Sequence, residues 1–171
     1  MKIFFGCPIQ GHRTRGERSA RYQEIIDTLV SEGCRVLSEH VTGKSTEEVA
    51  HMLEKSIGPL PPPGLQRIIY TRNKMIELLE GDIDGIIFEV SVPSTGTGVE
   101  IAHAYLRPRL GLKEVPILAL YEKDFWPNNL SSMIKGLTPE VAPKFKLVEY
   151  THSDELKKAI KIFVKNLVAK N

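Results

Sequence analysis

The sequence has few of the residues that mark a disulfide framework, a zinc site or a membrane span. Cysteine occurs only at Cys7 and Cys34 among 171 residues, without CxxC spacing, and there are only five histidines. This pattern predicts buried thiols rather than a disulfide framework, and we expect no bound metal. No apolar run approaches the roughly 20 residues that a transmembrane helix needs, so we expect no membrane partner.

The chain also lacks an excess of charge of one sign. It has 23 Lys and Arg against 21 Asp and Glu, for a formal net charge of +2, and Trp126 is its only tryptophan. A nucleic-acid-binding surface needs clustered positive charge and repeated aromatic side chains, so we expect no nucleic-acid partner. The first residues form a strand-like run without the apolar segment of a signal peptide, and we therefore expect a cytoplasmic protein.

Length and hydrophobic periodicity predict one domain over residues 1–171. Strands are expected at residues 2–6, 34–37, 83–90, 115–121 and 145–148. Helices are expected at residues 18–31, 45–56, 65–80, 99–110, 130–134 and 153–168. The proline-rich segment 58–64 is expected to be a surface loop, because prolines lack an amide donor. Alternating strands and helices predict an α/β fold with a five-stranded parallel sheet and a ligand crevice at the strands' carboxyl ends.

The most informative segment is 93–100, which follows the expected central strand. Its glycines allow close backbone approach, and its hydroxyls and amides at a helix start are suited to a phosphate. The spacing matches neither a P-loop nor a dinucleotide-binding fingerprint. Glu100 falls on the first turn of the expected helix, where a carboxylate is favoured by the helix dipole alone, so a structural role and a catalytic role both remain open.

Three other features leave two interpretations each. The loop at residues 11–18 is rich in arginine and suits either an anion or simple solvation. His40, at the end of the second expected strand, could contact a ligand, although a hydrogen bond within the core is the more common outcome. Glu89 lies within an apolar strand, where an unpaired carboxylate is costly, so it must have a partner or a role in the mechanism.

Five ordered blocks resemble a known family, at residues 3–13, 36–41, 69–73, 84–100 and 130–136. They are similar to the nucleoside 2-deoxyribosyltransferase superfamily, and within it to the 2′-deoxynucleoside 5′-phosphate N-hydrolases. The resemblance implies a flavodoxin-like, three-layer α/β/α domain that cleaves the N-glycosidic bond of a (deoxy)nucleoside 5′-monophosphate without a cofactor. It also implies a homodimer in which each subunit completes the neighbouring site.

The resemblance assigns roles to individual residues. Glu100 matches the nucleophile, Ser94 and the partner's Ser131 match phosphate ligands, and Asn73 stands where the family usually has a proton-transferring aspartate. The implied substrate-binding residues are Phe4, Cys7, Pro8, Ile9, Gln10, Gly11, His12, Arg13, Tyr22, His40, Ser94, Gly96, Gly98, Ser131, Ser132 and Met133.

The sequence departs from the family pattern at four of these positions. Phe4 replaces a common tyrosine, Pro8 a serine and Gln10 an arginine, and an amide at Asn73 cannot carry a proton as a carboxylic acid does. Two alternatives to the nucleotide hydrolase remain open. One is a deoxyribosyltransferase, and the other, given Asn73, is a nucleotide-binding module without catalysis.

Overall fold

The computed structural model describes residues 1–9, 14–43, 45–125 and 129–169. Five strands form a single parallel sheet in the order β2-β1-β3-β4-β5, which confirms the predicted architecture. The strands are β1 (Lys2–Gly6), β2 (Arg35–Val36), β3 (Gly85–Glu89), β4 (Ile117–Glu122) and β5 (Phe145–Tyr150). In this order the chain reverses its direction across the sheet between β1 and β3, and ligands of doubly wound folds bind at that point.

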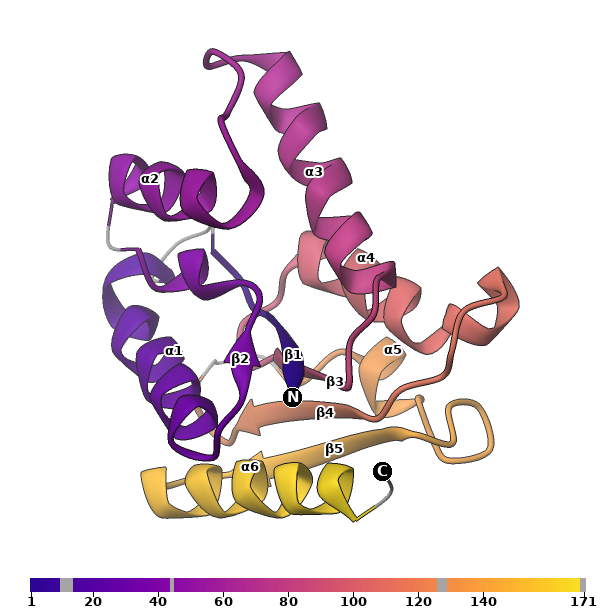
Figure 1. Ribbon diagram of the computed structural model, residues 1–171. Coiled ribbons are helices and arrows are strands. Elements are labelled where there is room, and N and C mark those ends of the chain that lie inside the picture. Colours follow the sequence, from indigo (N-terminus) through magenta and orange to yellow (C-terminus); the bar gives the residue numbers. More distant parts are fainter. Residues whose placement is uncertain (10–13, 44, 126–128, 170–171) are drawn as a thin grey trace.

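Helices cover both faces of the sheet (Figure 1). On one face, α1 (Thr14–Ser31) and α6 (Ser153–Val168) pack over an apolar core that includes Ile25 and Ile160. On the other face lie α3 (Leu65–Glu80), α4 (Thr95–Tyr105) and the short α5 (Ser132–Lys135). The second core cluster, which includes Leu79 and Ile101, fills the space beneath them. The two clusters make the molecule a three-layer α/β/α domain.

Two further elements lie outside the three layers, beyond the carboxyl end of β1. They are the short 3-10 helix η1 (Glu39–Thr42) and the helix α2 (Thr46–Ile57), which contact one another. Segment 58–64 is neither helix nor strand, as predicted, and leads into α3, whose first turns project from the body of the molecule (Figure 1). Residues of η1, α2 and α3 form one wall of the cavity described below.

The helix after β3 begins earlier than its sequence pattern predicted. The hydroxyl of Ser94 accepts a hydrogen bond from the amide of Thr97, so α4 begins at Thr95 rather than at residue 99. Side-chain capping overrides the low helix propensity of the two glycines that follow. The prediction that Glu100 lies in the first helical turn is therefore wrong, because it lies in the second turn. The expected helix 99–110 also ends early, at Tyr105, and the 3-10 helix η2 (Arg107–Leu110) follows it.

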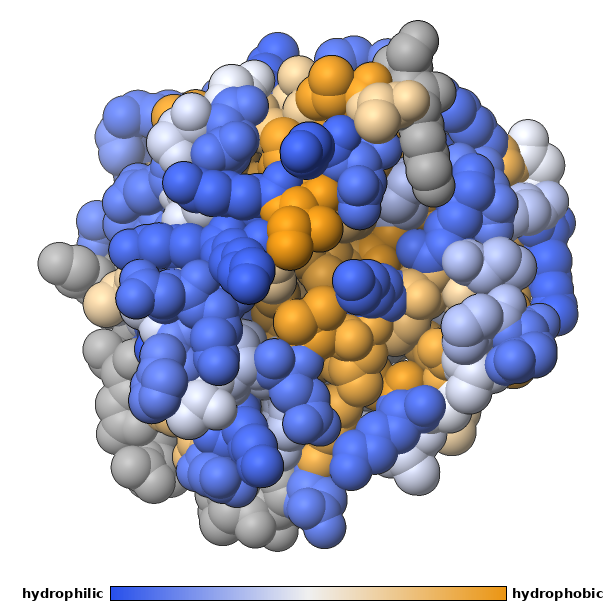
Figure 2. Space-filling view, turned by 90° about the horizontal axis from the view of Figure 1, so that it is seen from below, coloured by the Kyte–Doolittle hydropathy of each residue, from blue (hydrophilic) through white to orange (hydrophobic). Residues whose placement is uncertain are grey.

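Strand β5 is an edge strand, because it pairs only with β4. Figure 2 shows apolar side chains reaching the surface among charged ones on this side of the molecule. A groove of about 290 Å³ runs here between β5 and α6 and includes Val148 and Ile162. Exposed Lys146 and Glu149 on the same strand discourage uncontrolled edge-to-edge pairing. Among the helices of the described residues, none is long and apolar enough to span a bilayer.

Candidate active site

A cavity of about 570 Å³ opens at the carboxyl end of β1, beside the first turns of α4. Its walls come from β1, η1, α2, α3 and the segment from Pro93 to Glu100. Apolar side chains make up one wall: Val41, Val49, Leu53 and Met75. Polar groups line the opposite side, at the start of α4. The cavity thus offers an apolar surface for a flat group and polar contacts for a charged one.

Glu100 is the only carboxylate among the described residues that line this cavity. Its side chain is partly buried, and one of its carboxylate oxygens lies against the backbone of Gly6 at the end of β1. Burial raises the pKa of Glu100 to about 7. At neutral pH a large fraction of the carboxylate is therefore ionised, while it lacks the hydration that would make it unreactive.

His40 lines the same cavity from η1. It is 3% exposed, and its Nδ1 atom has no hydrogen-bond partner among the described residues. Burial lowers the pKa of His40 to about 4, so the imidazole is neutral at physiological pH. The expected hydrogen bond within the core is not formed by Nδ1. A buried ring nitrogen without a partner is costly, and a ligand in the cavity would offset that cost.

The start of α4 supplies hydrogen-bond donors to the cavity. Ser94 caps the helix by accepting the amide of Thr97 at 3.3 Å, and Gly96 adds no side chain to the first turn. The first amides of a helix have no partner within the helix, and the helix dipole favours an anion beside them. With the hydroxyl of Thr95, these groups form a candidate phosphate site.

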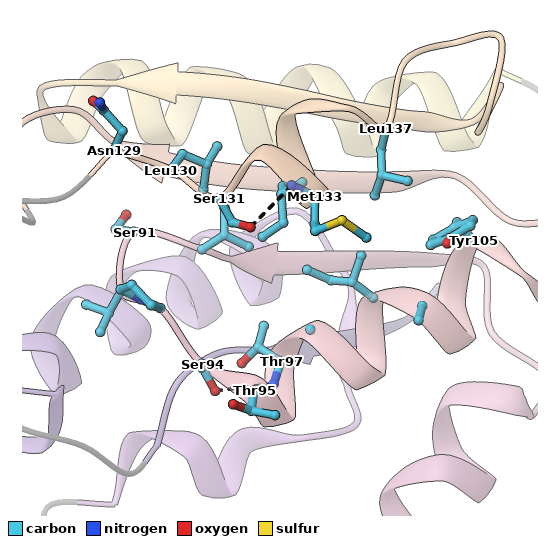
Figure 3. Close-up of a pocket in the computed structure, with 17 residues that line it drawn as sticks. Ser91, Ser94, Thr95, Thr97, Tyr105, Asn129, Leu130, Ser131, Met133 and Leu137 are labelled. Atoms are coloured by element: carbon cyan, nitrogen blue, oxygen red, sulfur yellow. Dashed lines mark hydrogen bonds between the residues drawn. The ribbon is translucent and has the colours of Figure 1, made fainter.

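A second cavity, of about 400 Å³, lies on the other side of the α4 start and shares Ser94 with the first. Figure 3 shows that Ser94 and Thr97 come from α4 and its cap, and that Ser131 and Met133 come from the segment entering α5. The Ser131 hydroxyl caps α5 by accepting the amide of Met133 at 3.3 Å. Met133 is 81% exposed, so this cavity is open along the α5 side.

The structure places ten of the fourteen described residues that the family resemblance selected in one of the two cavities. The first cavity contains Phe4, Cys7, Ile9, His40, Ser94, Gly96 and Glu100, and the second adds Gly98, Ser131 and Met133. Pro8 and Ser132 line neither cavity, and Tyr22 is buried in the core, where its hydroxyl donates to the carbonyl of Pro8 at 2.9 Å. Gln10, Gly11, His12 and Arg13 lie outside the described residues.

Asn73 does not line the cavity that contains Glu100. Its side chain is exposed on α3, where its oxygen accepts a hydrogen bond from Arg72 at 3.1 Å, and it lines neither cavity. Thr71 and Met75 of the same helix face the first cavity instead. These two residues are four apart and share one helix face, whereas Asn73 falls between them on another face. Sequence reasoning did not select Thr71 or Met75, although their helical spacing was a usable signal.

A buried polar cluster lies on the opposite face of the sheet. Arg18 of α1 is 2% exposed and donates to Glu89 at 2.6 Å, to Glu122, and to the hydroxyl of Tyr150 at 3.3 Å. Glu89 also accepts the amide of Ser91 at 3.2 Å. Despite its burial, the pKa of Arg18 lies above the ordinary value, because the Glu89 carboxylate stabilises its charge. Of the two interpretations that the sequence left open for Glu89, a partner or a role in the mechanism, the structure supports the first, and the partner is Arg18.

Among the described residues, no three His, Cys, Asp or Glu side chains come close enough together to hold a metal ion. Cys7 and Cys34 are both buried free thiols, as predicted. Burial raises the pKa of the Cys7 thiol well above its ordinary value, and the nearby Glu89 and Glu100 raise it further. Cys7 therefore contributes packing rather than thiolate chemistry.

A parallel α/β domain with a carboxylate between an apolar wall and a helix start fits the class of enzymes that cleave glycosidic bonds. Sequence comparison supports this class. No family model matches the chain. Three proteins named "Putative 2'-deoxynucleoside 5'-phosphate N-hydrolase 1" are similar to it over most of both chains. The protein from Thermofilum pendens is 34% identical over 155 residues, which are 91% of this chain and 89% of that protein. The protein from Methanosarcina mazei is 32% identical over 96% of this chain and 84% of its own length, and the protein from Nematostella vectensis is 32% identical over 90% and 87%.

The chain therefore belongs to the 2′-deoxynucleoside 5′-phosphate N-hydrolase 1 family, which is nucleoside 2-deoxyribosyltransferase-like.

Proposed function

We propose that this protein hydrolyses the N-glycosidic bond of (deoxy)nucleoside 5′-monophosphates to a free base and (deoxy)ribose 5-phosphate. The observation that carries the proposal is the position of Glu100, partly buried in the first cavity between an apolar wall and the start of α4. The names of the similar proteins support the same activity. No cofactor is needed for this chemistry, because a carboxylate and water suffice.

The cavity suggests how a nucleotide binds. Its 5′-phosphate would lie at the start of α4, against the amides of the first turn and the hydroxyl of Ser94. Its base would lie against the apolar wall that includes Val49 and Met75, within reach of the ring nitrogen of His40. The sugar would then lie between them, close to Glu100. This arrangement gives a hydrogen-bond partner to the Nδ1 atom of His40, which has none among the described residues.

In the proposed reaction, one oxygen of Glu100 bonds to C1′ of the sugar as the bond from C1′ to the base nitrogen breaks. The electron pair of that bond leaves with the base, which takes up a proton. Water then attacks C1′, the ester bond to Glu100 breaks, and the carboxylate and a proton are released. The two displacements retain the configuration at C1′, as in glycosidases with a carboxylate nucleophile.

Asn73 is the basis for one alternative, a nucleotide-binding module without catalysis. An amide at this position does not deliver a proton to the leaving base, and Asn73 lines neither cavity. A protein that binds nucleotides without cleaving them is therefore the second candidate function. A transferase, which passes the sugar to another base, is less favoured, because the serine at the start of α4 matches the phosphate-binding residue of the nucleotide hydrolases.

The test is incubation of the purified protein with deoxy- and ribonucleoside 5′-monophosphates and the corresponding nucleosides, with and without an acceptor base. Chromatography of the products separates the candidates. Free base from the monophosphates supports hydrolysis, and a new nucleotide formed with the acceptor base supports transfer. Nucleotide binding measured by calorimetry, without any released base, would support the binding module.

We also propose that the protein is a homodimer in which Ser131 and Met133 of one subunit help to form the neighbouring site. Met133, which lines the second cavity, is 81% exposed, and Val99 of α4 is 46% exposed, so both leave apolar surface that a partner subunit could cover. The test mixes two inactive variants, Glu100→Ala and Ser131→Asp, whose added charge repels phosphate. Mixed dimers with one intact shared site would recover activity. If the mixture stays inactive, or light scattering gives a monomer, subunit sharing is wrong.

A further inference from the structure

The last residue of β1 is a glycine although its backbone does not require one. Four glycines of the described residues have a positive φ, at positions 33, 58, 64 and 111, and Gly6 is not among them. Glycine weakens a strand, because it costs backbone entropy and packs nothing, so its presence there points to a close approach by another group.

Two groups occupy the space that a side chain at position 6 would fill. A β-carbon built on Gly6 would lie 2.8 Å from the Oε2 atom of Glu100 and 2.6 Å from Cε1 of Phe88. Phe88 lies directly across from Gly6 in the register of β1 and β3, and its ring is fully buried. The Glu100 carboxylate therefore rests on bare backbone, beside the Phe88 ring.

From this contact we infer that Gly6 is a positioning residue for the Glu100 carboxylate. The inference rests on the proposed function, in which Glu100 is the nucleophile. Because position 6 has no side chain, the carboxylate lies deep against β1 rather than further out in the cavity. The same contact explains why the carboxylate is desolvated, since backbone and an aromatic ring replace water on that side.

The Gly6→Ala substitution tests the inference. A carbon and an oxygen ordinarily stay about 3.3 Å apart or more, so the new methyl group would displace the carboxylate by roughly half an ångström. Glu100 is flexible at its end and moves at little cost in stability, but misplacement of a reacting group by about 1 Å costs about 100-fold in rate. We expect kcat to fall about 10- to 100-fold, with KM changing less than about threefold.

Two control variants separate displacement of Glu100 from other effects. Gly33→Ala makes the same chemical change at a positive φ with open space around it, so it lowers Tm through backbone strain without touching the cavity. It should keep the kcat of the unsubstituted protein. Phe88→Leu in the Gly6→Ala background relieves the contact with the ring. If that double variant regains full kcat, the loss arose through Phe88, and the inference about Glu100 is wrong.

The pKa of Glu100, measured by NMR titration of labelled glutamate carboxyls, gives a readout that does not depend on activity. Displacement into the cavity restores hydration, so Gly6→Ala should lower this pKa by about one unit or more. An unchanged pKa together with an unchanged kcat would overturn the inference. If the unsubstituted protein cleaves no nucleotide, the proposed function fails, and the pKa comparison alone then decides whether Gly6 positions the carboxylate.

Discussion

Two carboxylates near the carboxyl end of β3 are buried in opposite ways. Glu89 faces the layer of α1 and α6, is 0% exposed, and accepts hydrogen bonds from Arg18 and Ser91. Glu100 faces the other layer, is only partly buried, and burial is the one cause that shifts its pKa among the described residues. The first carboxylate is held by a counter-charge, whereas no cation of the described part of the chain lowers the pKa of the second.

The difference separates a structural carboxylate from a reactive one. A buried ion pair compensates two desolvated charges and fixes the elements that carry them, here α1 and the ends of β3, β4 and β5. A desolvated carboxylate without a cation destabilises the fold, and it persists where that state is useful for chemistry. The cluster around Arg18 thus holds together the carboxyl ends of the strands, where the cavity-lining segment 91–98 begins.

The largest expected effect is on kcat and comes from replacing Glu100, the reactive carboxylate. Glu100→Gln should lower kcat by about 10³-fold or more, because the nucleophile is lost while shape is kept. The same variant should raise the free energy of unfolding at pH 8 by on the order of 1 kcal/mol, after allowance for solvent screening. Base release and urea denaturation measure the two effects. Glu77→Gln, at an exposed carboxylate of α3, is the control and should keep kcat unchanged, with at most a small change in stability from its surface ion pair with Lys74.

Substitutions in the ion pair of Arg18 and Glu89 should change the free energy of unfolding. Arg18→Met leaves Glu89 buried without its cation and should lower the free energy of unfolding by about 3–5 kcal/mol. Adding Glu89→Leu removes the buried, unpaired carboxylate and should recover much of the lost stability. Chemical denaturation of the two variants gives the comparison. A double variant no more stable than Arg18→Met would show that packing, rather than charge compensation, is what the cluster contributes.

Stability as a function of pH distinguishes the two titratable groups of the cavity. The folded-state pKa of His40, about 4, is below the unfolded value of about 6.5, so the unfolded state binds the proton first and stability is lost as pH falls through this window. Glu100 acts oppositely: its folded-state pKa of about 7 is raised, so its protonation adds stability as pH falls from 7 to about 4.5.

The measurement is therefore made in the Glu100→Gln background, where His40 is the only group titrating at acid pH among the described residues that line the cavity. Adding His40→Gln should reduce the loss of stability between pH 7 and pH 4.5 by roughly 2 kcal/mol. Denaturation curves at the two pH values supply the difference. Equal losses with and without His40 would mean that the imidazole is accessible to protons in the folded state.

The smallest expected effect concerns the phosphate. Ser94→Ala should reduce the preference for a monophosphate over the matching nucleoside about tenfold in kcat/KM, because one hydrogen bond to a charged group is lost. It should also cost about 1 kcal/mol of stability through the lost helix cap. Ser45→Ala is the matched control, since Ser45 caps α2 in the same way, at 3.1 Å from the amide of Glu48, and lines neither cavity. A similar change in preference for both variants would assign the effect to stability alone.

Much of the fold was predictable because it follows from local patterns of apolar and polar residues. The apolar run 83–90 predicts a strand buried on both faces, and alternation with amphipathic segments predicts a parallel sheet. The start of α4 was not predictable, since two glycines within four residues argue against a helix. The Ser94 cap, which depends on backbone geometry, decided it. The family resemblance selected Glu100, but no pattern in the sequence placed it against Gly6.

The sequence by itself determined the layer architecture, the edge of the sheet that carries the cavity, and the chemical types available there. Periodicity and the right-handed connection of parallel strands are sufficient for that. Only the tertiary structure decided that Arg18 neutralises Glu89, that Thr71 and Met75 rather than Asn73 face the cavity, and that Glu100 rests on the bare backbone of β1. These contacts join residues from separate elements, and their distances depend on how whole helices pack on the sheet.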